Sequence, residues 1–280
     1  MPRDHPRRIL LHPGFHKTGT SSIQHLLWTN RKLLSPRTQI LLLRHLKPAA
    51  EICMHYSRHQ SPVALTNLVE AMDGILAEHY PEGDDRDLLI SCEGLSGHLP
   101  GWPGVMDYRA APVTALFLAG YLAERRPGSE LMIVYTTRDP DVWLNSAWRH
   151  HLFGQRLRLD WPVFEARYRP AADLESVIQQ TAEALDWIPV HMINLADAAR
   201  HPLGPGGPML ELLELPSALT RRIVPVGQGN AGPDASLAAE YLRLNLSSLS
   251  DVEVKAKKTA LAAANGVGGW ANAARLPNGA

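Results

Sequence analysis

The chain has 280 residues, of which 45% are hydrophobic, and its 28 Lys and Arg residues balance 28 Asp and Glu residues. This balance excludes the broadly basic surface by which many proteins bind nucleic acid or anionic membranes, so we expect no nucleic-acid partner. The longest apolar stretch, residues 113–123, is about half of the roughly 20 residues that a membrane-spanning helix needs. The only two cysteines, Cys53 and Cys92, form no metal-binding pattern and suit a reducing compartment. We therefore expect a cytoplasmic protein without a transmembrane segment.

The first predicted elements form a strand, a Gly-rich turn and a helix. Residues 8–12 (RILLH) are typical of a short buried strand, and the sequence PGFHKTGTSS follows directly. Ile23, Leu26, Leu27 and Leu34 then recur at a spacing that places them on one face of a helix. This strand–turn–helix order is the context in which Gly-rich loops bind phosphate.

Strands and helices continue to alternate along the rest of the chain. The pattern predicts, in order, a helix over 63–80, a strand over 87–92, a helix over 112–125, a strand over 131–137, a helix to about 153 with Asp139 as its N-cap and Pro140 at its first position, helical structure over 160–187, a strand over 188–195, loops over 201–208 and 226–236, and a helix over 237–246. A tail over about 262–280 has little core-forming content. We expect one α/β domain over 1–280, with helices on both faces of a mostly parallel sheet in a three-layer α/β/α arrangement.

The turn has the spacing of an ATPase phosphate loop, but its lysine is displaced. Gly14 and Gly19 are spaced as in a Walker loop and Ser21 follows, yet position 20 is Thr20 and the lysine is Lys17. In a Walker loop the lysine reaches the β- and γ-phosphates, and the hydroxyl after it binds magnesium. The displaced lysine therefore disfavours a standard ATPase or kinase loop and favours an anion site that needs no metal.

Backbone amides and hydroxyls from Thr18 to Ser22 would converge on an oxyanion at the start of the helix, where the helix dipole adds a positive partial charge. The segment GFHKTGTSSIQ resembles the 5′-phosphosulfate loop of sulfotransferases that use 3′-phosphoadenosine 5′-phosphosulfate (PAPS). A second motif of that family is an arginine at a strand end with a serine eight residues later, and the segment YTTRDPDVWLNSAWRHH contains both. The two motifs together span 8–153.

The resemblance implies a metal-independent, in-line transfer of a sulfuryl group from PAPS to a hydroxyl or amine of a carbohydrate, lipid or small-molecule acceptor. The residues that it assigns to nucleotide binding are Phe15, His16, Lys17, Thr18, Gly19, Thr20, Ser21, Arg138 and Ser146. Arg138 and Ser146 would hold the 3′-phosphate, and Lys17 would stabilise the bridging oxygen as negative charge develops there. The C-terminal lid of the cytosolic members has no convincing counterpart in the stretch around Arg221 and Arg222.

The acceptor hydroxyl needs a base, and two residues are candidates. Glu93 directly follows the strand over 87–92, at the sheet edge where ligands bind in open parallel sheets, and it resembles the carboxylate base of carbohydrate- and peptide-modifying members. His98 lies five residues further on, near the histidine used by the small-molecule branch. His16, beside Lys17, would either contact the transferred group or pack within the turn. We favour Glu93 because it is nearest to the strand end.

Several questions stay open at this point. A P-loop kinase or nucleotide hydrolase, and a homologue that binds nucleotide or sulfate without catalysis, are the alternative functions. The basic run over 149–158 would either face an anionic acceptor or form a solvated helix face. Trp143 and Trp148 are expected to be core or flank residues rather than to stack on the adenine. The sequence identifies neither the acceptor nor the oligomeric state.

Overall fold

A parallel five-stranded sheet, in the order β2-β3-β1-β4-β5, forms the centre of the fold. It is seen in a computed structural model that describes residues 6–226 and 232–267. The strands are β1 (Arg8–His12), β2 (Thr38–Leu42), β3 (Asp87–Ser91), β4 (Glu130–Thr137) and β5 (Val190–Asn194). The predicted α/β fold with a parallel sheet is confirmed, as are the four predicted strands. The edge strand β2 was not predicted.

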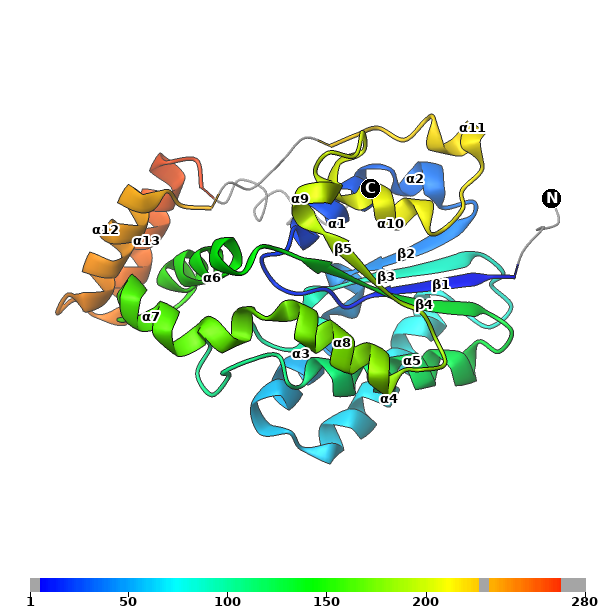
Figure 1. The fold of residues 1–280 in the computed structure, drawn as a ribbon, viewed down its shortest axis with the longest axis horizontal. Helices are drawn as coiled ribbons and strands as arrows, with labels where there is room; N and C mark the ends of the chain where they lie inside the picture. The colour runs from blue at the N-terminus through cyan, green and yellow to red at the C-terminus, as the bar shows by residue number, and fades with distance from the viewer. Residues whose placement is uncertain (1–5, 227–231, 268–280) are drawn as a thin grey trace.

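Helices cover both faces of the sheet (Figure 1). Successive side chains of a strand point to opposite faces, so Ile9 and Leu11 of β1 join one apolar core and Leu10 joins the other. The larger core packs against α3 (Leu43–His59), α4 (Pro62–His79), α5 (Ala111–Arg125), α6 (Pro140–Gly154), α7 (Trp161–Tyr168) and α8 (Leu174–Ala184). The smaller core packs against α1 (Thr20–Thr29), α2 (Arg31–Leu34) and α10 (Gly207–Glu211). The expected three layers follow from this arrangement.

The predicted helices are confirmed with some differences. α4, α5, α6 and α12 (Ala235–Leu246) match the predicted ranges closely, and Asp139 caps α6 by accepting from the amides of Asp141 and Val142. The helical stretch over 160–187 is divided into α7, a 3₁₀ turn η2 (Arg169–Ala172) and α8. The remaining elements are η1 (Glu93–Ser96), α9 (Leu195–Ala198), η3 (Gly204–Gly206), α11 (Ser217–Thr220) and α13 (Asp251–Ala264).

Three expectations about loops and ends differ from the structure. The predicted loop over 201–208 contains η3 and the start of α10. The tail expected over 262–280 begins inside α13, and 268–280 lie outside the described residues. The predicted loop over 226–236 ends with the first turn of α12, while its residues 227–231 also lie outside the described part.

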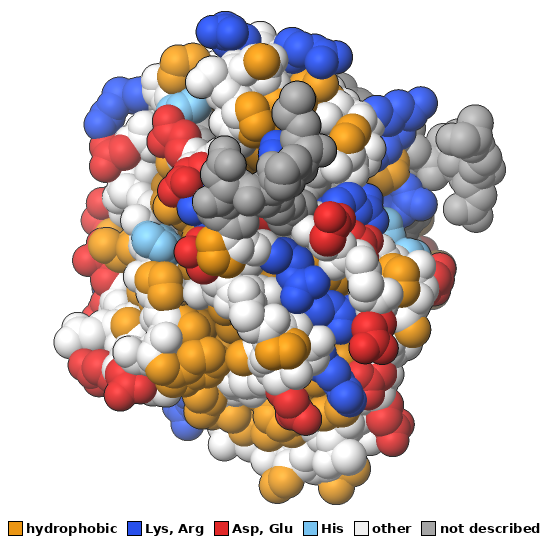
Figure 2. Space-filling view, turned by 90° about the vertical axis from the view of Figure 1, so that its right-hand side faces the viewer, with side chains coloured by type: hydrophobic (Ala, Val, Ile, Leu, Met, Phe, Trp, Pro, Cys, Tyr) orange, Lys and Arg blue, Asp and Glu red, His pale blue; other side chains and the backbone are white. Residues whose placement is uncertain are grey.

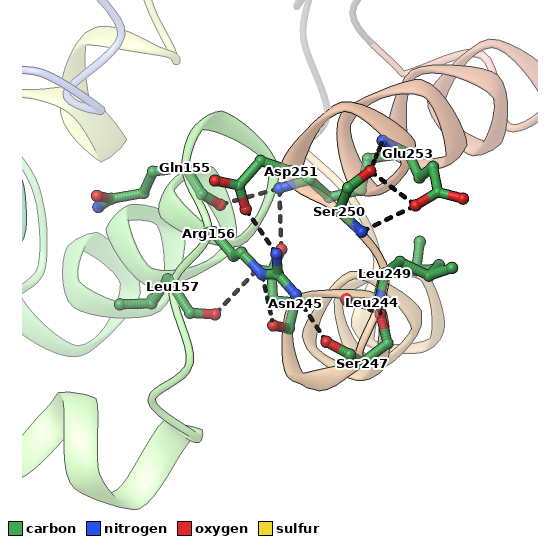
Figure 3. Close-up of polar contacts among 11 residues, drawn as sticks. Gln155, Arg156, Leu157, Leu244, Asn245, Ser247, Leu249, Ser250, Asp251 and Glu253 are labelled. Atoms are coloured by element: carbon green, nitrogen blue, oxygen red, sulfur yellow. Dashed lines mark hydrogen bonds and ion pairs between the residues drawn. The ribbon is translucent and has the colours of Figure 1, made fainter.

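The helices α12 and α13 lie beside α6 rather than on the sheet (Figure 1). Arg156, just after α6, donates to the carbonyls of Asn245 at 3.1 Å and Ser247 at 2.6 Å and pairs with Asp251 at 2.5 Å (Figure 3). Lys258 is 4% exposed, and its ammonium donates to the carbonyls of Leu152 and Gln155 at the end of α6. A cation at the carboxyl end of a helix is favoured by the helix dipole. These contacts fix the two C-terminal helices to α6.

All five strands point the same way, so their carboxyl ends share one edge of the sheet. The face from which the strands start is the one in Figure 2, where basic and acidic side chains are interspersed and hydrophobic side chains gather over the lower half. Within the described residues, no helix is long and apolar enough to cross a membrane. The opposite edge carries the motif residues described next.

Candidate active site

The loop between β1 and α1 takes three left-handed backbone conformations. Gly14 has φ of +60°, Lys17 of +70° and Gly19 of +92°. A side chain at Gly14 would bring a Cβ atom to 3.1 Å from Nε2 of His12, and one at Gly19 would bring it to 2.5 Å from Leu195. The positive φ therefore favours glycine at both positions, and the space around each is tight. Lys17 takes the same kind of conformation despite its Cβ, at a cost typical of functional loops.

Buried hydrogen bonds stabilise the conformation of this loop. The hydroxyls of Thr18 and Thr20 donate to the carbonyl of Phe15 at 2.7 and 3.2 Å, and Thr18 also bonds to the hydroxyl of Thr136 on β4 at 2.8 Å. Phe15 is fully buried, with its ring 4.9 Å from that of Tyr135. The side chains of Phe15, Thr18 and Thr20 thus support the loop from the core side. Ser21 is exposed in the first turn of α1.

His16 is held from two sides. Its amide donates to the hydroxyl of Tyr108 at 3.1 Å, and its Nδ1 lies 3.2 Å from the same hydroxyl. Its carbonyl accepts from the indole of Trp143 on α6 at 2.9 Å. Trp143 is fully buried and Trp148 is 9% exposed, which confirms that both tryptophans belong to the core. His16 therefore packs within the turn while its neighbour Lys17 is half-buried beside it.

The structure brings the arginine of the second motif to the loop. Arg138 is the first residue after β4, and β4 is adjacent to β1 in the sheet. Its Nη1 donates to the carbonyl of Lys17 at 3.1 Å, across 121 residues of sequence. Ser146 lies two turns into α6, which begins beside Arg138, and is half-buried. The loop and the Arg138 motif, predicted from separate parts of the chain, thus lie at one edge of the sheet.

The two candidate bases occupy the same edge. Glu93 begins η1 immediately after β3, is half-buried, and accepts from Nε2 of Gln24 on α1 at 2.9 Å. His98 follows η1; its amide donates to the hydroxyl of Ser57 at 3.0 Å and its ring lies 5.6 Å from that of Trp102. Glu93 lies within electrostatic range of Lys17, and His98 within range of His16.

Burial sets the charges of this cluster. It lowers the pKa of Lys17, as does the nearby Arg138, whereas Glu93 acts in the opposite direction. Burial lowers the pKa of Arg138 as well. Burial also lowers the pKa of His16 and of His150 to about 3, with further contributions from neighbouring cations and imidazoles. At neutral pH the site therefore holds two cations that favour a bound anion, together with imidazoles that are uncharged.

In the structure, the basic run over 149–158 makes mostly structural contacts. Arg149 donates to the carbonyl of Pro233 at 2.9 Å, and Arg156 anchors the C-terminal helices. His151 is fully buried and bonds to the carbonyl of Pro100 at 2.7 Å. The interpretation of this run as one solvated helix face is also wrong for these three residues. His150 differs from these three residues. It is half-buried and lies within electrostatic range of Lys17.

Four residues of this region were not predicted as site residues: Gln24, Tyr108, Trp143 as a loop anchor, and His150. His150 lies four residues after Ser146 and so on the same face of α6, a spacing that the sequence contains. Tyr108 lies within the loop between η1 and α5 and carries no local signal. Arg221 and Arg222 are exposed after α11, and nearby Val224 is tied to Asn30 at the end of α1 by two hydrogen bonds.

No group of three or more His, Cys, Asp or Glu side chains that could hold a metal ion occurs within 6–226 and 232–267. No known family model matches the chain, and neither does any curated protein. Among solved structures, a chain from the structure of the PezAT chromosomal toxin–antitoxin system of Streptococcus pneumoniae is similar over 88% of this chain and 90% of its own length, with 11% sequence identity and a TM-score of 0.36. A likeness of that extent assigns no function.

Proposed function

We propose that the chain is a sulfotransferase that moves a sulfuryl group from PAPS to an acceptor hydroxyl. The observation that supports this most is the contact of Arg138 with the carbonyl of Lys17, because it joins the arginine motif to a phosphate loop whose lysine is displaced. The loop would take the 5′-phosphosulfate, with amides and the Ser21 hydroxyl at the start of α1 facing the phosphate. Arg138, with Ser146, would take the 3′-phosphate, which a planar guanidinium matches well.

The reaction breaks one bond and forms one at sulfur. The acceptor oxygen attacks sulfur while the bond from sulfur to the bridging phosphate oxygen breaks, and 3′-phosphoadenosine 5′-phosphate leaves. Lys17 would stabilise the negative charge that develops on the bridging oxygen, and Glu93 would take the proton of the acceptor hydroxyl. The protein mainly positions the reactants and stabilises charge, as in phosphoryl transfer.

Transfer of labelled sulfuryl from ³⁵S-PAPS to a panel of glycosides, phenols and long-chain alcohols tests this function. Lys17→Ala should abolish transfer without lowering the melting temperature, since it removes the only lysine of the loop. Glu93→Gln should reduce kcat by about 10²-fold or more while changing nucleotide affinity little, because a general base contributes roughly 10²–10⁴-fold. Equal losses of kcat and nucleotide affinity in Glu93→Gln would argue against a base.

A P-loop kinase or nucleotide hydrolase is the second candidate. A parallel sheet with a strand–turn–helix phosphate loop is common to that class. Against it, Thr20 stands where the class has its lysine, and the Thr20 hydroxyl donates to the carbonyl of Phe15. This candidate predicts magnesium-dependent binding of ATP. A non-catalytic homologue would bind the nucleotide tightly and transfer to no member of the panel.

A further inference from the structure

Gln24 joins the phosphate loop to the candidate base. It lies on α1, one turn after the residues that open the helix, and its Nε2 donates to Oε2 of Glu93 at 2.9 Å and to the carbonyl of Ser91 at 3.3 Å. Both partners are acceptors only, so the amide nitrogen with its two hydrogens must be the end that faces them. The contact spans 69 residues of sequence.

The end of β3, two residues before Glu93, is buried and hydrogen-bonded to β1. Ser91 is fully buried, and its hydroxyl bonds to Nδ1 of His12, the last residue of β1, at 2.8 Å. Gln24 donates to both the Ser91 carbonyl and the Glu93 carboxylate. The two hydrogen bonds together hold Oε2 of Glu93 close to the end of β3.

A neutral amide suits this task better than a cation. An arginine or lysine paired with Glu93 would stabilise its charged form strongly and weaken it as a base, whereas an amide orients the carboxylate with a smaller effect on its basicity. Thr20 and Gln24 are four residues apart, so they lie on the same face of α1. One helix thus carries both the start of the phosphate site and the group that orients Glu93.

We propose that Gln24 is a positioning residue that sets the carboxylate of Glu93 for proton removal and ties its position to the helix that would hold the 5′-phosphate. This inference rests on the proposed function, in which Glu93 is the base. Gln24 acts through Glu93, and its loss should change the rate of transfer far more than nucleotide affinity.

A double-mutant cycle on the full chain tests this. The variants are Gln24→Met, Glu93→Gln and the pair, with ³⁵S-PAPS as donor and methyl glucoside, p-nitrophenol, octanol and water as acceptors. Gln24→Met should lower kcat about tenfold, a part of the effect of a general base. It should change the dissociation constant of 3′-phosphoadenosine 5′-phosphate less than about twofold, and it should cost nothing further in the Glu93→Gln background.

The chain offers a matched control in Gln179→Met, since Gln179 makes the same kind of bond to Glu183, at 3.0 Å, on the exposed side of α8. This variant should keep the wild-type kcat. Gln24→Glu should move the acid limb of the pH profile of kcat to higher pH, because two adjacent carboxyl groups share a proton.

The outcomes separate the two proposals. A wild-type chain that transfers to no acceptor, water included, removes the proposed function and this inference with it. An active wild type in which Gln24→Met costs as much with Glu93→Gln as without it overturns the role of Gln24 alone. Unchanged kcat in Gln24→Met, or an unmoved pH profile in Gln24→Glu, does the same.

Discussion

Two features of Lys17 lower the stability of the folded chain, and a glycine at this position would remove both. Its φ of +70° lies in the left-handed region, which costs a residue with a Cβ about 1–2 kcal/mol. Its ammonium is also partly desolvated and near Arg138, the causes that lower its pKa. Lys17→Gly should therefore give a chain that is more stable than the wild type in the absence of ligand, and inactive in transfer.

The backbone part of this gain can be isolated with Lys17→Ala as the reference. Alanine removes the ammonium but keeps the Cβ, so the two variants differ only in backbone freedom. Glycine gains about 1–2 kcal/mol in the left-handed conformation and loses about 0.4–1 kcal/mol to the greater freedom of the unfolded chain. The free energy of unfolding of Lys17→Gly should thus exceed that of Lys17→Ala by roughly 0.5–1 kcal/mol.

Urea denaturation in a buffer free of phosphate and sulfate measures this difference, since either anion would stabilise the wild type selectively by binding. Transfer from ³⁵S-PAPS is measured on the same preparations. A Lys17→Gly chain less stable than Lys17→Ala would refute the backbone reasoning. Substantial transfer by either variant would refute the assignment of Lys17 to the bridging oxygen.

Three further predictions concern the nucleotide, pH and the C-terminal helices. Arg138→Lys should weaken binding of 3′-phosphoadenosine 5′-phosphate about tenfold and of AMP little, by calorimetry, because lysine lacks the guanidinium fork; equal losses would contradict a 3′-phosphate role. Burial lowers the pKa of His12 to about 3, below its ordinary 6.5, so its contribution is full above pH 6.5 and falls toward pH 3. From pH 7 to pH 5 the wild type should lose about 2 kcal/mol more unfolding free energy than His12→Gln in urea titrations, and parallel losses would contradict this. Lys258→Met should lower the unfolding free energy by about 1–3 kcal/mol by leaving buried carbonyls unpaired, whereas the exposed Lys257→Met should not, and similar values for the two would refute the anchoring role.

Local patterns predicted the elements that dominate the sheet. Runs of apolar residues identified β1, β3, β4 and β5, and the turn residues around Gly14 and Gly19 identified the loop. α3 was missed although Leu46, Ala49, Ala50 and Cys53 have helical spacing and are buried, because Pro48 in its interior argues against a helix. β2 was missed because its apolar run continues directly into Leu43, the first residue of α3, with no turn residue to mark where the strand ends.

The candidate site likewise has a part that the sequence predicted and a part that it did not. Lys17, Arg138 and Glu93 follow strands, so a parallel sheet brings them to one edge whatever the loops do. The contacts of Gln24 with Glu93 and of Arg149 with Pro233 join segments 69 and 84 residues apart and depend on tertiary packing. No periodicity in the sequence could have shown that Arg149 donates to a backbone carbonyl, or that Gln24 donates to a carboxylate.

Calorimetric titration of the purified chain with 3′-phosphoadenosine 5′-phosphate, AMP and ATP, each with and without magnesium, tests the central claim most directly. The account predicts that the 3′,5′-bisphosphate binds at least about tenfold more tightly than AMP, since Arg138 adds a charge-assisted contact to the 3′-phosphate, and that magnesium changes this little. ATP binding that requires magnesium, with indifference to the 3′-phosphate, would contradict it and favour a P-loop kinase.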